Sequence, residues 1–265
     1  MIKMKVYAKV KKDHNSGLIV GHTDNIQKAI YGFNELASEV ILYYSLDDIY
    51  DAVTREDIVV DYIQQCDNIF AKFGVLNPHV EDYPDCLKPF LGRKIWKDTI
   101  NSIAQNEKKW SAGWFIKPLQ SKAFTGKVIR SIKDLVGCGA YNIDYEVYCS
   151  EALEIKREWR CFVYYDEIID IRPYTGDWHY NYDSKVVDEI LKTFKTWDNR
   201  PVACSIDIGV TKDGKTILIE CNDAYFLGSY GLDDFKYAKL ISARWAQLLS
   251  REDPFDYRKY EVEKK

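Results

Sequence analysis

The chain has 265 residues, 46% hydrophobic and 29% charged, which is the composition of an ordinary globular protein with a substantial core. Its net charge of −4 gives no electrostatic basis for broad nucleic-acid binding, so nucleic acid is not an expected partner. Seven cysteines without a Cys-x-x-Cys pair suggest neither a disulfide framework nor a zinc site, and reduced thiols fit a cytoplasmic location. No stretch approaches membrane-spanning length, and no apolar signal region follows Met1, so we expect no membrane partner.

The first part of the chain alternates strand-like and helix-like segments, the pattern expected of α/β architecture. Strands are expected over Lys5–Val10, Leu18–Val20, Val40–Tyr44 and Ile58–Val60, and helices over Asn25–Glu39, Leu46–Val53 and Tyr62–Phe73. Three of the seven prolines then fall between Asn77 and Gly92, which marks a boundary loop. We therefore predict an N-terminal α/β domain over residues 1–89, which serves as a scaffold or as one wall of a cleft.

The remaining elements follow in a less regular order. They are a helix from Arg93 to about Lys108, an apolar strand over Trp114–Pro118, a strand-rich stretch over residues 145–174, and helices over Val186–Phe194 and Asp234–Ser250. Charged residues dominate positions 251–265, where we predict a frayed C-terminal tail.

A hairpin is predicted between residues 203 and 222. Asp213-Gly214 between two alternating apolar runs is a strong hairpin signal and favours a two-residue type I′ loop. Counting back from that loop places Asp207 directly opposite Glu220. Because side chains alternate along a strand, Ile219 is then expected on the opposite, apolar face.

Asp207, Glu220 and Asn222 share the polar face of this hairpin. Like charges directly opposite each other destabilise a sheet, so we expect a cation between the carboxylates. Carboxylate and amide oxygens suit Mg²⁺. The alternative is a solvated polar face whose register differs by one residue.

Lys117 and the loop Thr125-Gly126-Lys127 are candidate phosphate contacts. A lysine at the end of an apolar strand is hard to bury without a partner, and a phosphate is one good partner. The alternative is an ammonium that reaches solvent at the strand end. The loop offers backbone N–H groups, a hydroxyl and a charge, but it lacks the Walker A pattern and also reads as a plain turn.

Two arginines stand on successive predicted strands. Arg160 and Glu158 share a strand face, so Arg160 is placed to contact a phosphate while Glu158 holds it, although a structural ion pair explains them equally well. Arg172 and Tyr174 share a face of the next strand. An arginine there suits a substrate carboxylate, and surface aromatics packing a loop are the alternative. The candidate acceptor pocket comprises Arg172, Tyr174, Trp178, His179, Tyr225, Phe226 and Tyr230.

Taken in order, these residues resemble the ATP-grasp superfamily. More closely, the chain resembles the ATP-grasp clade with arginine at the first phosphate-binding position and lysine at the second. The motifs that carry the resemblance are Phe90-Leu91-Gly92-Arg93, Phe115-Ile116-Lys117-Pro118, Lys122-Ala123-Phe124-Thr125-Gly126-Lys127, Glu158-Trp159-Arg160 and Ile219-Glu220-Cys221-Asn222. It covers roughly residues 80 to 235. It implies an α/β and α+β chain with an ATP-grasp fold, in which residues 1–89 precede the grasp and two α+β subdomains over residues 90–250 close on ATP.

The resemblance also implies roles for individual residues. Asp207, Glu220 and Asn222 would bind Mg²⁺ ions that bridge the ATP phosphates. Lys117 would contact the α- and β-phosphates, and Arg160 the γ-phosphate or an acyl-phosphate intermediate. The further nucleotide contacts would be Arg93 and Lys94 at the first basic position, Thr125, Gly126 and Lys127 in a loop over the phosphates, and Ser150, Glu151, Ala152, Leu153 and Glu154 beside the adenine and ribose.

The implied function is an ATP- and Mg²⁺-dependent ligase that joins a carboxylate to an amine. In this chemistry the carboxylate attacks the γ-phosphate, ADP leaves, and the amine displaces phosphate from the acyl phosphate. A small-molecule kinase with the same fold and a non-catalytic nucleotide-binding module are the alternatives. The carboxylate and amine substrates, whether small molecules or peptides, are not identified by the sequence.

Overall fold

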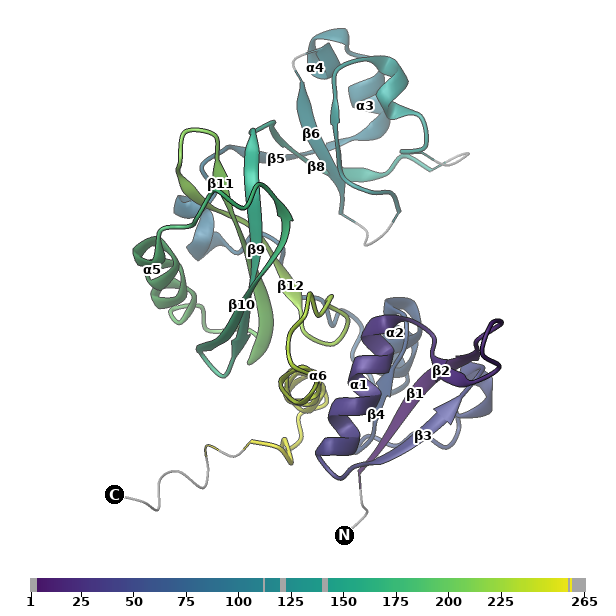
Figure 1. The fold of residues 1–265 in the computed structure, drawn as a ribbon. Helices are drawn as coiled ribbons and strands as arrows, with labels where there is room; N and C mark the ends of the chain where they lie inside the picture. The colour runs from purple at the N-terminus through teal and green to yellow at the C-terminus, as the bar shows by residue number, and fades with distance from the viewer. Residues whose placement is uncertain (1–3, 112, 120–122, 140–142, 257, 259–265) are drawn as a thin grey trace.

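The structure, a computed structural model, describes residues 4–111, 113–119, 123–139, 143–256 and 258. These residues form three four-stranded sheets, each with its own flanking helices (Figure 1). The mixture of α/β and α+β architecture expected from the sequence is confirmed. No helix in the described part of the chain is both long and apolar enough to cross a bilayer.

The N-terminal sheet is built around its first strand, β1. Its elements are β1 (Lys5–Lys12), β2 (Ile19–Gly21), α1 (Asp24–Glu35), β3 (Glu39–Tyr43), the 3-10 helix η1 (Leu46–Asp48), β4 (Ile58–Val60) and α2 (Ile63–Lys72). Strand β1 pairs antiparallel with β2 and parallel with β3 and β4. The Thr23 side chain caps α1 by accepting from the Ile26 N–H. Helix α1 ends before the expected Glu39, because Ala37 adopts a φ of 55° and Glu39 already begins β3.

The middle sheet is antiparallel, in the order β5-β8-β6-β7. Its elements are β5 (Ile95–Thr99), α3 (Ile100–Ala104), α4 (Glu107–Ser111), β6 (Trp114–Pro118), β7 (Lys127–Ile129), the 3-10 helix η3 (Ile132–Leu135) and β8 (Glu146–Glu151). The helix expected to start at Arg93 is wrong. The β-favouring Ile95 and Trp96 pair with β8 instead, and Thr99 caps the first of two short helices by accepting from the Ser102 N–H.

The third sheet is antiparallel, in the order β10-β9-β11-β12, and carries the expected hairpin. Its elements are β9 (Ile155–Tyr164), β10 (Glu167–Gly176), α5 (Ser184–Phe194), β11 (Ala203–Thr211) and β12 (Thr216–Asp223). One face packs under α5 and the 3-10 helix η2 (Asp85–Phe90), with Trp159, Ile206 and Leu218 in that core. The other face is therefore free to hold polar groups.

Helix α6 (Asp234–Leu248) joins the third sheet to the N-terminal domain (Figure 1). It lies against α1 and shares one hydrophobic core with the N-terminal sheet, in which the Trp245 and Phe70 rings are 4.2 Å apart. The expected tail differs in its described part, because Phe255 is buried against Phe33 and Asp253 accepts a hydrogen bond from Ser242. The end of that expected tail, residues 257 and 259–265, lies outside the described residues.

The contact between α1 and α6 predicts a strong effect at Gly32. A Cβ at this position would lie 1.9 Å from the Asp234 carbonyl oxygen and 2.8 Å from the Ala238 Cβ. Gly32→Ala should therefore lower the free energy of unfolding by about 1–3 kcal/mol, measured by urea denaturation, although alanine favours helices over glycine. Asn34→Ala, on the exposed side of the same helix, is the control. A stabilised Gly32→Ala variant would contradict this packing.

Candidate functional site

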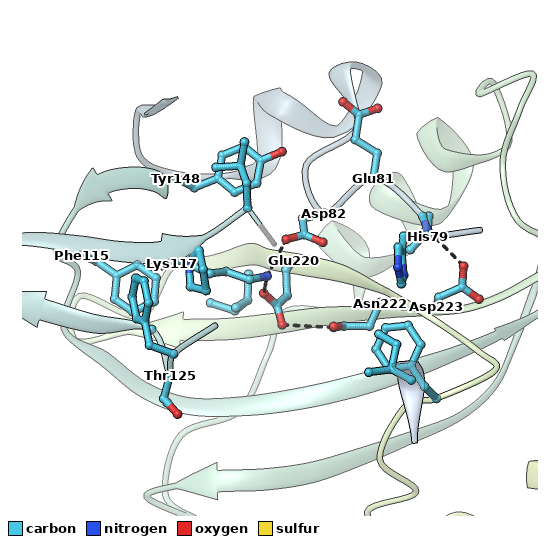
Figure 2. Close-up of a pocket in the computed structure, with 18 of the residues that line it drawn as sticks. His79, Glu81, Asp82, Phe115, Lys117, Thr125, Tyr148, Glu220, Asn222 and Asp223 are labelled. Atoms are coloured by element: carbon cyan, nitrogen blue, oxygen red, sulfur yellow. Dashed lines mark hydrogen bonds and ion pairs between the residues drawn. The ribbon is translucent and has the colours of Figure 1, made fainter. Parts of the chain in front are cut away.

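A cavity of about 1010 Å³ opens where the three sheets meet (Figure 2). The N-terminal domain and the loop after α2 contribute Ile63, Gln64, Asp67, His79, Val80, Glu81 and Asp82. The middle sheet and its loop contribute Phe115, Lys117, Pro118, Leu119, Phe124, Thr125, Gly126 and Tyr148. The third sheet and the loop after it contribute Glu158, Tyr174, Ile219, Glu220, Asn222, Asp223 and Phe226.

The hairpin turn has three residues rather than the expected two. The Thr211 N–H donates to the Lys215 carbonyl at 3.0 Å, which closes the hairpin around residues 212–214. Gly214 has a φ of +81°, the left-handed conformation that three-residue hairpin loops need. Counted from this turn alone, Asp207 would face Ile219 instead of Glu220.

A β-bulge in β12 restores the predicted pair. Ile208 pairs with Leu218 and Asp207 pairs with Glu220, so Ile219 is the extra residue. The bulge also exchanges two side chains between the faces: Leu218 is buried in the core below the sheet, and Ile219 lines the cavity. The expectation that Ile219 lies on the apolar face is wrong, because it assumed regular alternation through the bulge.

The three predicted metal ligands lie together. The Asn222 Nδ2 donates to Asp207 Oδ2 and to Glu220 Oε1, each at 3.1 Å. These oxygen ligands fit the preference of Mg²⁺. Glu220 and Asn222 line the cavity, whereas Asp207 is buried behind them. Among the described residues no group of three or more His, Cys, Asp or Glu is arranged to bind a metal, so the metal role of this set stays a prediction.

Asp207 is already engaged by Arg160. The Arg160 Nε donates to Asp207 Oδ1 at 2.9 Å and its Nη2 donates to Oδ2 at 2.6 Å, in a buried two-bond pair. Burial disfavours the charged form of Arg160, but the Asp207 carboxylate holds its pKa above the ordinary value. The expectation that Glu158 holds Arg160 is wrong, since Glu158 accepts from the Tyr174 hydroxyl at 2.7 Å.

Lys117 does not extend to solvent but lies between two carboxylates (Figure 2). Its Nζ donates to Asp82 Oδ2 at 2.6 Å and to Glu220 Oε2. Burial opposes the charge of Lys117, yet Glu220 and Asp82 raise its pKa above the ordinary value. Burial likewise opposes the charge of Glu220, but Lys117 brings its pKa below the ordinary value. Burial raises the pKa of Asp82 despite Lys117, so the ammonium stabilises the ionised form of Glu220 more effectively.

The segment that carries Asp82 is tied to β12. The Cys221 N–H donates to the Asp82 carbonyl at 2.9 Å, and the Val80 N–H donates to Asp223 Oδ2 at 3.1 Å. Arg244, from α6, forms a buried ion pair with the same Asp223 carboxylate. Sequence reasoning missed these residues, because no spacing links a proline-rich loop to a strand more than a hundred residues later.

The comparisons with known proteins agree with this arrangement. Residues 90–240 match a family model of the ATP-grasp domain, the second family of the clade named for its arginine and lysine. The chain belongs to this ATP-grasp family. No curated protein matches it.

Solved structures share the ATP-grasp fold with this chain. D-alanine–D-alanine ligase from Bacillus anthracis is similar at a TM-score of 0.55 and 12% identity, over 94% of this chain and 99% of that one. The same ligase complexed with ATP has a TM-score of 0.55 and 13% identity, over 95% and 99%. N5-carboxyaminoimidazole synthase from Aspergillus clavatus, in complex with ADP and 5-aminoimidazole ribonucleotide, has a TM-score of 0.54 and 10% identity, over 95% and 78%.

The first basic residue of the clade's pattern, Arg93, contacts the backbone of this ATP-grasp domain. Its guanidinium donates to the carbonyls of Leu91, Leu218 and Ile219 at 2.9–3.0 Å. It therefore supports the bulge in β12. Arg93 and Lys94 line a separate cavity of about 570 Å³.

Several other predicted nucleotide contacts lie apart from the large cavity. Thr125 and Gly126 line it, but the Lys127 Nζ donates to the Val136 carbonyl instead. Lys122, which belongs to the same motif, lies outside the described residues.

The predicted adenine segment, residues 150–154, follows Tyr148 of the cavity wall but does not itself line the cavity. Its members are engaged locally: Glu151 accepts from the Lys94 N–H, and Glu154 pairs with Lys156 and Lys212. The Ser150 hydroxyl donates to the Glu151 carbonyl, while Ala152 and Leu153 are half-buried.

The candidate acceptor residues separate into two groups. Arg172 pairs with Asp170 and does not line the cavity, and Trp178 stacks on His179 at the surface. Tyr174 and Phe226 do line it. Tyr230 stacks on Tyr174, and Tyr225 is buried with its hydroxyl donating to Asp67. The role of Arg172 toward a substrate carboxylate therefore has no support from its position.

The buried pair of Arg160 and Asp207 predicts a large stability effect. Asp207→Asn leaves a buried guanidinium without its counter-charge and should cost about 3–5 kcal/mol in urea denaturation. Asp166→Asn is a matched control, because Arg200 binds Asp166 with the same two-bond geometry at a more exposed place. It should cost less than about 1 kcal/mol. Equal losses would show that burial does not govern the Asp207 pair.

Proposed function

We propose that this protein is an ATP- and Mg²⁺-dependent ligase that joins a carboxylate to an amine through an acyl phosphate and releases ADP. The proposal is carried by the cavity that gathers Lys117, Glu220 and Asn222 from two different sheets in a chain of the ATP-grasp family. A phosphate-binding cation and oxygen ligands for a metal are the groups that phosphoryl transfer requires. A structural relative of similar length is a ligase complexed with ATP.

In this proposal the phosphates of ATP lie beside Lys117, below the Thr125-Gly126 loop. The Lys117 ammonium exchanges its carboxylate partners for phosphate oxygens, which its flexible stem permits. Glu220 and Asn222 would hold Mg²⁺, with Asp207 behind them. Bound Mg²⁺ would neutralise part of the charge on the transferring phosphoryl group. The base would lie toward residues 150–154, at the end of β8.

The third sheet positions the reacting groups. The substrate carboxylate oxygen attacks the γ-phosphorus, and the bond between that phosphorus and the ADP oxygen breaks. The amine then attacks the acyl carbon, phosphate leaves with the bonding electrons, and the amine nitrogen loses a proton. Arg160, held by Asp207 beside this end of the cavity, would stabilise the anionic groups as charge moves.

Nucleotide binding provides the first test of this placement. Lys117→Ala should raise the Kd of Mg·ADP at least tenfold, roughly the contribution of one charge-assisted phosphate contact, measured by isothermal titration calorimetry. Lys127→Ala is the matched control, since its Nζ contacts the Val136 carbonyl outside the cavity. It should leave the Kd within about twofold of wild type. An equal loss in both variants would contradict the placement of the phosphates at Lys117.

The reaction class is tested by products. We expect that pooled carboxylates and amines, incubated with Mg·ATP, release ADP and yield a condensed amide detectable by mass spectrometry. Glu220→Gln should abolish this ADP release while the variant stays folded by circular dichroism, because the lost charge acts while phosphate is transferred. A stable phosphoester product would identify a kinase instead. Normal turnover by Glu220→Gln would contradict the proposed metal-binding site.

A further inference from the structure

Asp82 is a carboxylate in the phosphate region that comes from outside the ATP-grasp match. It precedes residue 90, where the match begins, and its side chain is 27% exposed at the cavity wall. Lys117 is shared between Asp82 and Glu220, so two negative charges face one positive charge at this point (Figure 2).

The backbone of Asp82 is held in place independently of Lys117. Its carbonyl accepts from the Cys221 N–H of β12, and Val80, two residues before it, donates to the buried Asp223 carboxylate. Asp223 in turn is held by Arg244. When Lys117 turns toward a phosphate, the carboxylate of Asp82 therefore stays at the cavity wall without its former partner.

The charge at this wall treats two forms of nucleotide differently. A metal-free nucleotide would bring its anionic phosphates beside the carboxylates of Asp82 and Glu220, and like charges a few ångströms apart repel. A nucleotide that carries a divalent cation brings two positive charges to the same place. The ammonium of Lys117 already marks this position between the two carboxylates as favourable for a cation.

We propose that Asp82 is a specificity-determining residue that makes the nucleotide site select metal-bound over metal-free nucleotide. Its carboxylate disfavours the metal-free form and favours the metal-bound one, so that Lys117 can leave its ion pair only when another cation arrives. This inference rests on the proposed function, because it assumes that the phosphates lie beside Lys117. A purely structural ion pair between Asp82 and Lys117 would not produce the selection.

The test compares two dissociation constants of ADP by isothermal titration calorimetry. One titration is made with excess EDTA and the other with saturating Mg²⁺, for wild type and for Asp82→Asn. Asp82→Asn should bind metal-free ADP more tightly, by roughly threefold to tenfold, and Mg·ADP no more tightly than wild type. The ratio of the metal-free Kd to the Mg²⁺ Kd should fall accordingly. Asp85→Asn is the control, because Asp85 lies in the same segment but its side chain is 86% exposed and pairs with Lys88.

Each result decides the inference. An unchanged ratio, or weaker binding of metal-free ADP by Asp82→Asn, would overturn it and leave the proposed function standing. A wild-type protein that binds ADP in neither condition would overturn both. If circular dichroism shows that Asp82→Asn is unfolded, Asp82→Ser is titrated in the same way and judged by the same ratio.

Discussion

The geometry of this site depends on one irregular point, the bulge at Ile219 in β12. Without the extra residue, the three-residue turn would place Ile219 opposite Asp207 and move Glu220 to the core face. Arg93 donates to the carbonyls of Leu218 and Ile219, which the bulge directs away from regular pairing. A residue from before the middle sheet therefore stabilises the strand that carries the polar side chains of the cavity.

The charges around the cavity are balanced within the protein. Arg160 compensates Asp207, Lys117 compensates Glu220 and Asp82, and Arg244 compensates Asp223. Buried carboxylates need such partners, because a charge without one is strongly disfavoured in a partly dry interior. These pairs differ in how readily they can exchange. The fork of Arg160 is fixed by two hydrogen bonds, whereas a lysine ammonium on a flexible stem can change partners.

Sequence reasoning succeeded where the signal was local or ordered. The pairing of Asp207 with Glu220 and the strand ending in Lys117 are confirmed, and the order of motifs identified the ATP-grasp family. The pairing was right although the turn was wrong, because the longer loop and the bulge each shift the register by one residue and cancel. Asp82 and the backbone contacts of Arg93 could not be predicted, since both depend on approaches between distant segments that leave no periodic trace in the sequence.

The last helix of the chain completes the core of the first domain. Trp245 of α6 packs on Phe70 of α2, and Gly32 of α1 allows the close approach of α6. A ribosome releases the N-terminal strands long before it releases α6, and contacts so far apart in sequence form slowly. The N-terminal sheet therefore emerges with an uncovered apolar face, which only the end of translation can close. In the cell, this makes the newly made first domain a natural client for chaperones until the whole chain has been synthesised.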